Sequence, residues 1–141
     1  MKLQVVPYVM LNGTAAQAIA DYEKLLGATI VFRQTFGEGP QPEGFVLDEE
    51  QRQRIAHAVL QIGETQLMVA DSLPSAPTTF GTAVNLCLLL EDPEEAARLY
   101  EVLSEGGTII EKLQAVYFSP AYAMITDRYG VTFQLFTKRP S

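Results

Sequence analysis

The pattern of apolar and polar positions along the chain predicts one series of elements that occurs twice. In the first half, apolar residues recur at helical spacing over residues 14–26, after the capping residue Thr14, and Gly27 is placed to end the helix in a left-handed conformation. Runs rich in β-branched and aromatic residues predict the strands around this helix. These strands lie at residues 3–10, 28–36, 56–62 and 65–70.

The second half repeats this series and has a sharper helix start. Asp92, Pro93 and Glu95 combine a cap, a first-turn proline and the spacing of a capping box, which predicts a helix that continues to about residue 105. Residues 82–90 are the most apolar run, which is typical of a central strand. Further strands are predicted at residues 108–118, 121–126 and 131–137.

The two halves also match residue by residue. Residues 17–31 read QAIADYEKLLGATIV, residues 95–110 read EAARLYEVLSEGGTII, and a later strand in each half carries Gln-Leu. The copies are 78 positions apart at Tyr-Glu (22 and 100) and 68 apart at Gln-Leu (66 and 134). The repeat predicts a single α+β domain of two βαβββ modules, about 1–71 and 82–138, joined by loop 72–81. The Pro- and Gly-containing segment 37–54 is predicted to be a long mobile loop.

Composition narrows the partners and the location. The chain has 141 residues, a net charge of −7 and ten Lys and Arg residues that are scattered along it, which argues against nucleic acid or an anionic membrane surface as a partner. The acidity suits a neutral or cationic small molecule, or it serves only to keep the protein soluble. One cysteine, no apolar run of ~20 residues and a poor match to a signal peptide predict a cytoplasmic protein.

Strand alternation assigns three amide side chains to one cleft. If the aliphatic faces of the strands pack under the helices, each opposite face presents one amide. The three amides are those of Gln66, Asn85 and Gln134. The residues expected to form the apolar wall beside them are Met68, Cys87, Leu89 and Phe136.

Five segments carry a resemblance to a known superfamily. In order, they are VPYVMLNG, AIADYEKLLGA, HAVLQIGETQLMVAD, LEDPEEAARLYEVLSEGG and MITDRYGVTFQLF. As an ordered set they resemble the vicinal oxygen chelate superfamily, and most closely its PhnB-like, glyoxalase/bleomycin-resistance branch. The resemblance covers the whole chain and implies two βαβββ modules that form a curled mixed sheet around a cleft, with helices outside. It also implies a homodimer, because many members build the pocket from two chains.

The resemblance further indicates where metal-using members hold a divalent ion, with His, Glu or Gln side chains. Pro7, Gln66, Asn85 and Gln134 stand at those four positions. Proline has no side-chain donor, neutral amides are weak ligands for transition metals, and no carboxylate supplies the charge that a hard cation needs. We therefore expect no bound metal and no cofactor.

Further side chains are candidates for chemistry or for ligand contact. His57, the only histidine, is expected to face the cleft, where it acts as a general base or ligand contact, or else makes an ordinary structural hydrogen bond. Asp71 binds a cationic group or caps a turn. Four aromatic residues offer an aromatic, hydrogen-bonding wall or belong to the core: Tyr8, Tyr117, Phe118 and Tyr122. Cys87, on an apolar strand without nearby cations in sequence, is expected to be a buried, inert thiol.

Two functions remain after this reading, together with a third possibility, a dimeric domain that has no small ligand. The first is a metal-free small-molecule binding protein of the glyoxalase/bleomycin-resistance type. The alternative is a glyoxalase-like lyase or dioxygenase that uses an unrecognised metal set, or acid–base chemistry by His57 and Asp71. Metal analysis of the purified protein separates the metal-dependent form of the alternative from the first reading.

Overall fold

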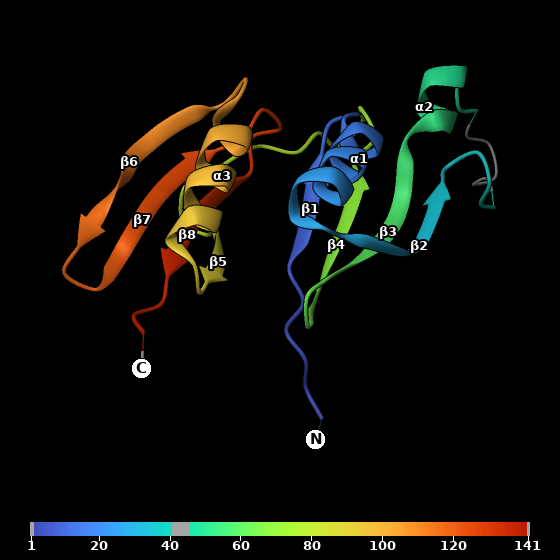
Figure 1. Cartoon of the computed structure of the whole chain (residues 1–141). Helices are drawn as coiled ribbons and strands as arrows, with labels where there is room; N and C mark the ends of the chain where they lie inside the picture. Colours follow the sequence, from blue (N-terminus) through green and yellow to red (C-terminus); the bar gives the residue numbers. More distant parts are fainter. Residues whose placement is uncertain (1, 41–45, 141) are drawn as a thin grey trace. The chain divides into compact units, whose positions relative to one another are not determined.

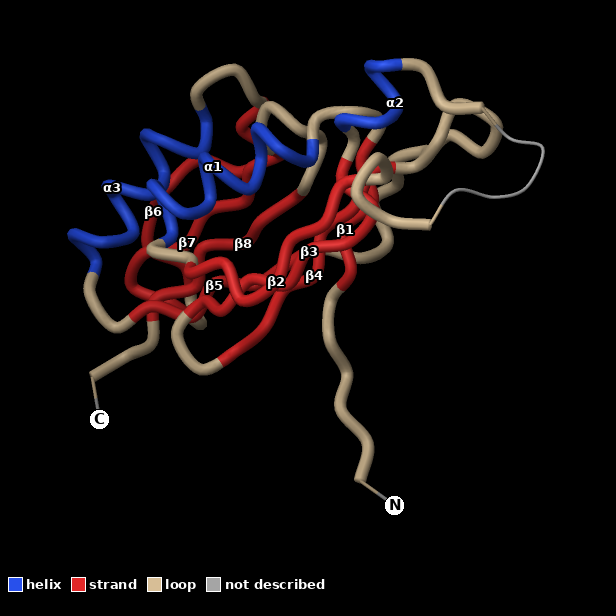
Figure 2. The backbone as a smooth tube through the Cα atoms, turned by 90° about the vertical axis from the view of Figure 1, so that its right-hand side faces the viewer, coloured by secondary structure: helices blue, strands red, loops and turns tan. Residues whose placement is uncertain are grey.

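The computed structural model describes residues 2–40 and 46–140 and divides into two compact units, one up to Thr79 and the other from Phe80. Each unit is a four-stranded mixed sheet with a 12-residue helix across one face (Figures 1 and 2). The α+β fold class of two βαβββ modules is thereby confirmed. Each unit is described below by itself.

The first unit builds its core between one helix and one sheet. Its elements are β1 (Tyr8–Leu11), α1 (Ala15–Leu26), β2 (Thr29–Thr35), α2 (Glu49–Gln53), β3 (Ile55–Ile62) and β4 (Thr65–Asp71). The strand order is β1-β4-β3-β2, with β1 parallel to β4 and the other pairs antiparallel. Apolar residues of α1 that are buried against the sheet include Ile19 and Tyr22. Gly27 ends the helix at φ 67°, as predicted.

The second unit repeats this arrangement. Its elements are β5 (Leu86–Leu90), α3 (Pro93–Ser104), β6 (Thr108–Val116), β7 (Ser119–Thr126) and β8 (Thr132–Thr137). The order β5-β8-β7-β6 matches that of the first unit, and β5 runs parallel to β8. The Asp92 side chain accepts a hydrogen bond from the Glu94 N–H (2.9 Å) with Pro93 in the first turn, which confirms the predicted helix start.

Two strands differ from their predictions. β1 begins at Tyr8 rather than at residue 3, and Figure 1 shows the chain before it leading away from the sheet. Pro7 has no N–H, so only its carbonyl joins the ladder, accepting from the Met68 N–H at 3.0 Å. β5 is shorter than predicted and is an edge strand, not a central one. Its apolar composition suggested burial on both faces, yet Leu89 is 61% exposed.

Helix α2 corrects part of the predicted loop at 37–54. The Asp48 carboxylate accepts from the Gln51 N–H (2.8 Å), and the Gln51 side-chain oxygen accepts from the Asp48 N–H (3.1 Å). This reciprocal pair is a capping box, and its Asp-x-x-Gln spacing was present in the sequence. Residues 41–45 of the predicted loop lie outside the described part of the chain.

The hydrogen-bond register corrects how the two halves correspond. Leu11 lies opposite Asp71 in the first unit, and Leu90 lies opposite Thr137 in the second. The carbonyl of each leucine accepts from the next residue of the longer strand, the Ser72 and Lys138 N–H groups, at 2.7 Å. Positions in β4 and β8 therefore correspond at a separation of 66 residues (71 and 137), not 68. The counterpart of Gln134 is Met68 rather than Gln66.

Candidate functional site

The face of each sheet that its long helix does not cover carries most of the predicted site residues. We call these the first open face and the second open face. The first includes Tyr8, Phe32, His57, Val59 and Met68, and the second includes Glu111, Tyr122, Met124, Gln134 and Phe136, as strand pairing shows. The opposite faces hold buried core residues such as Val69 and Leu135. The predicted inside-outside alternation of β4 and β8 is confirmed.

A tyrosine–histidine pair forms the polar centre of the first open face. The Tyr8 hydroxyl lies 2.7 Å from His57 Nδ1. The His57 ring also lies beside the ring of Phe32, with a centroid separation of 5.8 Å. β1 and β3 present the two polar side chains from opposite sides of β4. The structure therefore gives His57 a tyrosine as its partner, which the sequence did not reveal because 49 residues separate them.

The tautomer of His57 sets the direction of this hydrogen bond. Burial raises the pKa of the Tyr8 phenol above its ordinary value of 10.0, so the phenol is protonated at neutral pH. When Nδ1 carries the proton, it donates to the phenol oxygen; when Nδ1 carries none, the phenol donates to Nδ1 and the ring proton is on Nε2. In that tautomer, His57 offers a donor rather than a base at Nε2.

A chain of hydrogen bonds forms the polar centre of the second open face. The Tyr122 hydroxyl donates to Gln134 Oε1 at 2.8 Å, and Gln134 Nε2 donates to Asn85 Oδ1 at 3.0 Å. Two of the three predicted amides are thus brought together, and Tyr122 joins them. Because Gln134 uses both ends of its amide, the Nδ2 group of Asn85 ends the chain with free donors among the described residues.

Aromatic rings lie next to this chain. Phe118 and Phe136 stack with centroids 5.5 Å apart and an interplanar angle of 27°, and Tyr122 meets the edges of both rings. Phe136 was predicted to contact a ligand, whereas Phe118 was weighed only as one of several aromatics. Tyr122 is 6% exposed and Phe118 is 38% exposed. The cluster therefore combines an accessible ring, that of Phe118, with a buried tyrosine whose hydroxyl makes a part-buried hydrogen bond.

Gln66 and Cys87 differ from the picture drawn from sequence. Gln66 is exposed, lies beside Gln61 near the β3–β4 turn, and takes no part in the chain of the other two amides. Cys87 is exposed, which contradicts the expected buried thiol, because β5 is an edge strand. Partial burial of its sulfur still raises the pKa of the thiol, so the thiol remains protonated at neutral pH.

The Asp71 carboxylate binds backbone N–H groups and takes no part in the first open face. Asp71 is 2% exposed and accepts from the Gly13 and Ala15 N–H groups at 2.8 and 3.0 Å, and from the Ile55 N–H at 3.0 Å. Thr14 makes no side-chain cap, so Asp71 caps α1 from another strand. The structure favours the capping interpretation over cation binding.

Two β-bulges place side chains on the open faces that alternation alone would have put elsewhere. In β2 the pairing steps from Ile30↔Leu60 to Phe32↔Val59, and in β6 it steps from Ile109↔Ile125 to Glu111↔Met124. Each bulge advances one strand by two residues and its partner by one. Phe32 and Glu111 were missed for this reason. The repeated Thr-Ile pair before each bulge marks equivalent positions, 29–30 and 108–109.

The residues at the expected metal positions do not fit a divalent ion. Gln134 and Asn85 bond to each other, and the register gives Met68, not Gln66, as the first unit's counterpart of Gln134. Across residues 2–40 and 46–140, no three His, Cys, Asp or Glu side chains are gathered as a metal site would require. Neutral amides that already hydrogen-bond to one another are poor ligands for a divalent cation.

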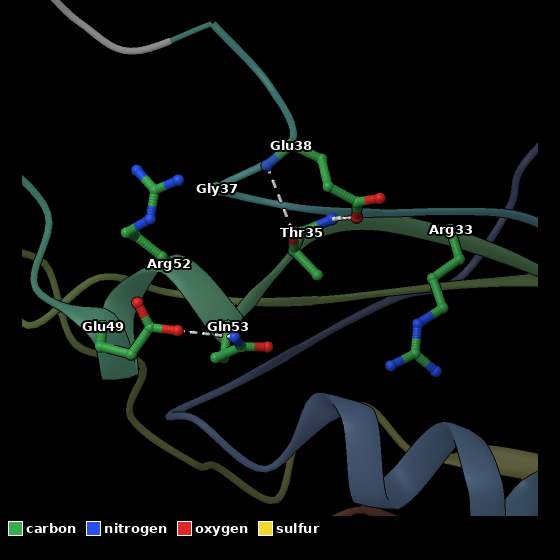
Figure 3. A pocket seen from close by; sticks show the side chains of 7 residues that line it. All are labelled: Arg33, Thr35, Gly37, Glu38, Glu49, Arg52 and Gln53. Carbon is green, nitrogen blue, oxygen red and sulfur yellow. Dashed lines mark hydrogen bonds between the residues drawn. The ribbon is translucent and has the colours of Figure 1, made fainter.

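A polar hollow of about 530 Å³ lies at the edge of the first unit, between the end of β2 and α2. Figure 3 shows its two guanidinium groups, from Arg33 and Arg52, on opposite sides of the hollow. Its two carboxylates are already bound, Glu38 to the Thr35 N–H at 2.8 Å and Glu49 to the Gln53 amide at 2.9 Å. The cations do not converge on one position, and the hollow is separate from the open face.

Comparisons with known proteins agree with the geometry. The family model described as Glyoxalase/Bleomycin resistance protein/Dioxygenase superfamily matches residues 4–135. Protein YjdN of Escherichia coli is 28% identical over 138 residues, which cover 92% of this chain and 91% of YjdN. Protein PA1353 of Pseudomonas aeruginosa has a TM-score of 0.87 and 30% identity, over 99% of this chain and 100% of that one. A PhnB protein of Bacillus cereus has a TM-score of 0.79 and 24% identity, over 96% and 99%.

Proposed function

Since the chain belongs to the glyoxalase/bleomycin resistance protein/dioxygenase superfamily, we propose that it acts as a metal-free small-molecule binding protein of the PhnB-like branch. The observation that carries this proposal is the Tyr122–Gln134–Asn85 chain on the second open face. Polar side chains that are ordered by one another, beside accessible aromatic rings, are typical of ligand sites.

The proposed ligand is a neutral or cationic organic molecule. The proposed contacts on the second open face are Asn85, Gln134, Tyr122 and Phe136. Those on the first open face, taken by itself, are Tyr8, His57, Gln66 and Met68. Asn85 ends its chain as a donor, so it would meet a carbonyl or ether oxygen of the ligand. No helix in the described part of the chain is long and apolar enough to cross a membrane, and we propose no membrane or nucleic acid partner.

A thermal-shift screen followed by substitution tests this proposal. Affinity for hits from the screen is expected to fall about tenfold in Asn85→Leu or Gln134→Leu, because one lost hydrogen bond is worth roughly that much. Gln17→Leu on the exposed side of α1 is the matched control and leaves affinity unchanged. Unaltered binding in both open-face variants would show that these amides are structural and that the ligand lies elsewhere.

The metal-free part of the proposal has its own measurement. Elemental analysis of protein never exposed to chelator is expected to find well under one equivalent of Zn, Ni, Fe, Mn or Co per chain. Chelator is expected to leave the melting temperature unchanged, because no donor set of the described residues fits such an ion. A stoichiometric metal whose removal lowers the melting temperature would contradict this.

The Tyr8–His57 pair supports a second candidate, acid–base catalysis by a glyoxalase-like lyase. Asp71 would take no direct part, because both its oxygens accept backbone hydrogen bonds. In this candidate, His57 moves the proton and Tyr8 holds its ring. A substrate turnover that is lost in His57→Gln but kept in Asp71→Asn, measured on folded protein, would favour the enzyme over the binding protein.

We also propose that the protein is a homodimer. The sheets end in edge strands β1, β2, β5 and β6, and β5 carries no charged side chain to discourage pairing. A second copy is the commonest partner for such a surface. Light scattering at micromolar concentration is expected to give twice the 15.5 kDa mass of one chain. A monomer at all concentrations would refute this part of the proposal.

A further inference from the structure

Glu111 places a carboxylate on the second open face. The bulge in β6 sets it opposite Met124, whereas an unbroken ladder would have placed it opposite Ala123, a fully buried core residue. Glu111 therefore shares a face with Met124 and with Tyr122, two positions earlier in β7. The side chain is exposed, so a ligand can reach it without displacing the core.

Among the described residues, no Lys, Arg or His side chain forms an ion pair with Glu111. The ion pairs Arg54–Glu50 and Arg98–Glu95 use other carboxylates. The negative charge of Glu111 also affects Tyr122. The pKa of the Tyr122 phenol is raised first by burial and then by the charge of Glu111. The open face thus combines an unbalanced negative charge with the Phe118, Tyr122 and Phe136 rings.

The first open face differs at the equivalent position. There the same bulge presents Phe32, which packs beside His57. The bulge and the repeat therefore do not by themselves place a carboxylate at this position. Of the two units, the second has a carboxylate there and the first has an aromatic ring.

We propose that Glu111 makes the second open face selective for ligands that carry one positive charge on an apolar body, such as a quaternary or protonated amine. The carboxylate balances the charge, and the aromatic cluster, in which Phe118 is exposed and Phe136 half-buried, holds the apolar part. This inference rests on the proposed binding function and adds a charge preference that the amides alone do not supply.

The test compares two small probes on the purified full chain. Benzyltrimethylammonium is expected to bind more tightly than neutral benzyl alcohol, and Glu111→Gln is expected to weaken the cation about threefold to tenfold while changing benzyl alcohol less than twofold. Glu101→Gln, which removes an equal charge from the exposed surface of α3, is the control and affects neither probe. Equal affinity for both probes in the wild-type protein overturns the charge preference and leaves the binding function standing.

A second measurement does not need a ligand. Removing the Glu111 charge is expected to lower the pKa of one tyrosine, that of Tyr122, in an absorbance titration of phenolate, and this shift is expected to be missing in a Glu111→Gln/Tyr122→Phe double variant. An unchanged tyrosine titration in Glu111→Gln shows that the carboxylate lies too far from the site and overturns the inference. Absence of binding by both probes, and by every compound that the thermal-shift screen tests, overturns the binding function as well.

Discussion

The two units have the same strand order, but the side chains that accept hydrogen bonds at the start of their long helices differ. In the first unit, Asp71 at the end of β4 accepts from the N–H groups of Ala15 and Ile55 as well as Gly13. In the second unit, Thr137 occupies the place of Asp71 and its hydroxyl is fully buried without a hydrogen-bond partner among the described residues. The side chain at this position therefore accepts three backbone hydrogen bonds in the first unit, whereas in the second its hydroxyl has no partner among the described residues.

Two prolines explain this difference. Ala15 is the first residue of α1, and Pro93 holds that place in α3. Ala58 and Ala123 face corresponding residues of β4 and β8, so Ile55, three positions before Ala58, corresponds to Pro120. Proline has no N–H, and the second unit therefore lacks the two donors that a carboxylate would need. Asp92 caps α3 locally instead.

The open faces diverge in the same way. The first pairs Tyr8 with His57 at its exposed surface, whereas the second ties Tyr122 to Gln134 and Asn85 partly below the surface. The repeat preserves the helices, the strand order, a bulge near the start of β2 and β6, and a glutamine at equivalent positions of the open faces, Gln34 and Gln114. It does not preserve the residues that form the two polar centres. A duplicated scaffold can therefore carry two different chemical surfaces.

Exchanging the residues at the corresponding strand ends is expected to have the largest effect. Asp71→Thr leaves at least two buried backbone N–H groups without an acceptor and is expected to lower the free energy of unfolding by roughly 3–5 kcal/mol. The reverse exchange, Thr137→Asp, buries a charge that has no donors and is expected to cost a similar amount. Urea denaturation measures both. A well-tolerated Thr137→Asp would show that the second unit has donors we have not identified.

Much of this fold could be predicted from sequence, because the signals are local. The helix ends rest on Gly27, Asp92 and Pro93, each of which acts within one turn. Alternation in β4 and β8 is read from neighbouring residues. The repeat then fixed the order of the elements, because both halves carry the same helix followed by the same strands.

The polar groups of the site could be predicted only in part, because their partners are distant in sequence. Nothing near Asp71 indicates that it caps a helix 56 residues earlier. The bulges that expose Phe32 and Glu111 cannot be recognised from the two-residue alternation of side chains along a strand. Aligning the two Gln-Leu pairs was wrong by two positions, because the same dipeptide lies at different register positions in β4 and β8.

Removing each tyrosine hydroxyl tests whether Tyr122 contributes more to the free energy of unfolding than Tyr8. Tyr122→Phe is expected to lower the free energy of unfolding by about 1–2 kcal/mol, and Tyr8→Phe by less than about 0.5 kcal/mol, since Tyr122 is 6% and Tyr8 45% exposed. Burial makes the folded pKa of Tyr122 higher than the unfolded value near 10.0. Its contribution is therefore complete below pH 10 and is lost as the pH rises toward the folded pKa. Equal costs for the two variants would remove this distinction.

The smallest effect is expected from removing the unpaired hydroxyl of the second unit. Thr137→Val keeps the shape of the side chain and deletes a buried polar atom that has no partner, so the free energy of unfolding is expected to stay constant or rise by up to about 1 kcal/mol. Thr132→Val on the same strand is the matched control. Its hydroxyl lies 2.7 Å from that of Thr126, and its loss is expected to cost about 1 kcal/mol. If Thr137→Val costs as much as Thr132→Val, the Thr137 hydroxyl has a partner in solution, such as a bound water. The second unit would then be anchored at this position through that partner, where the first is anchored by Asp71.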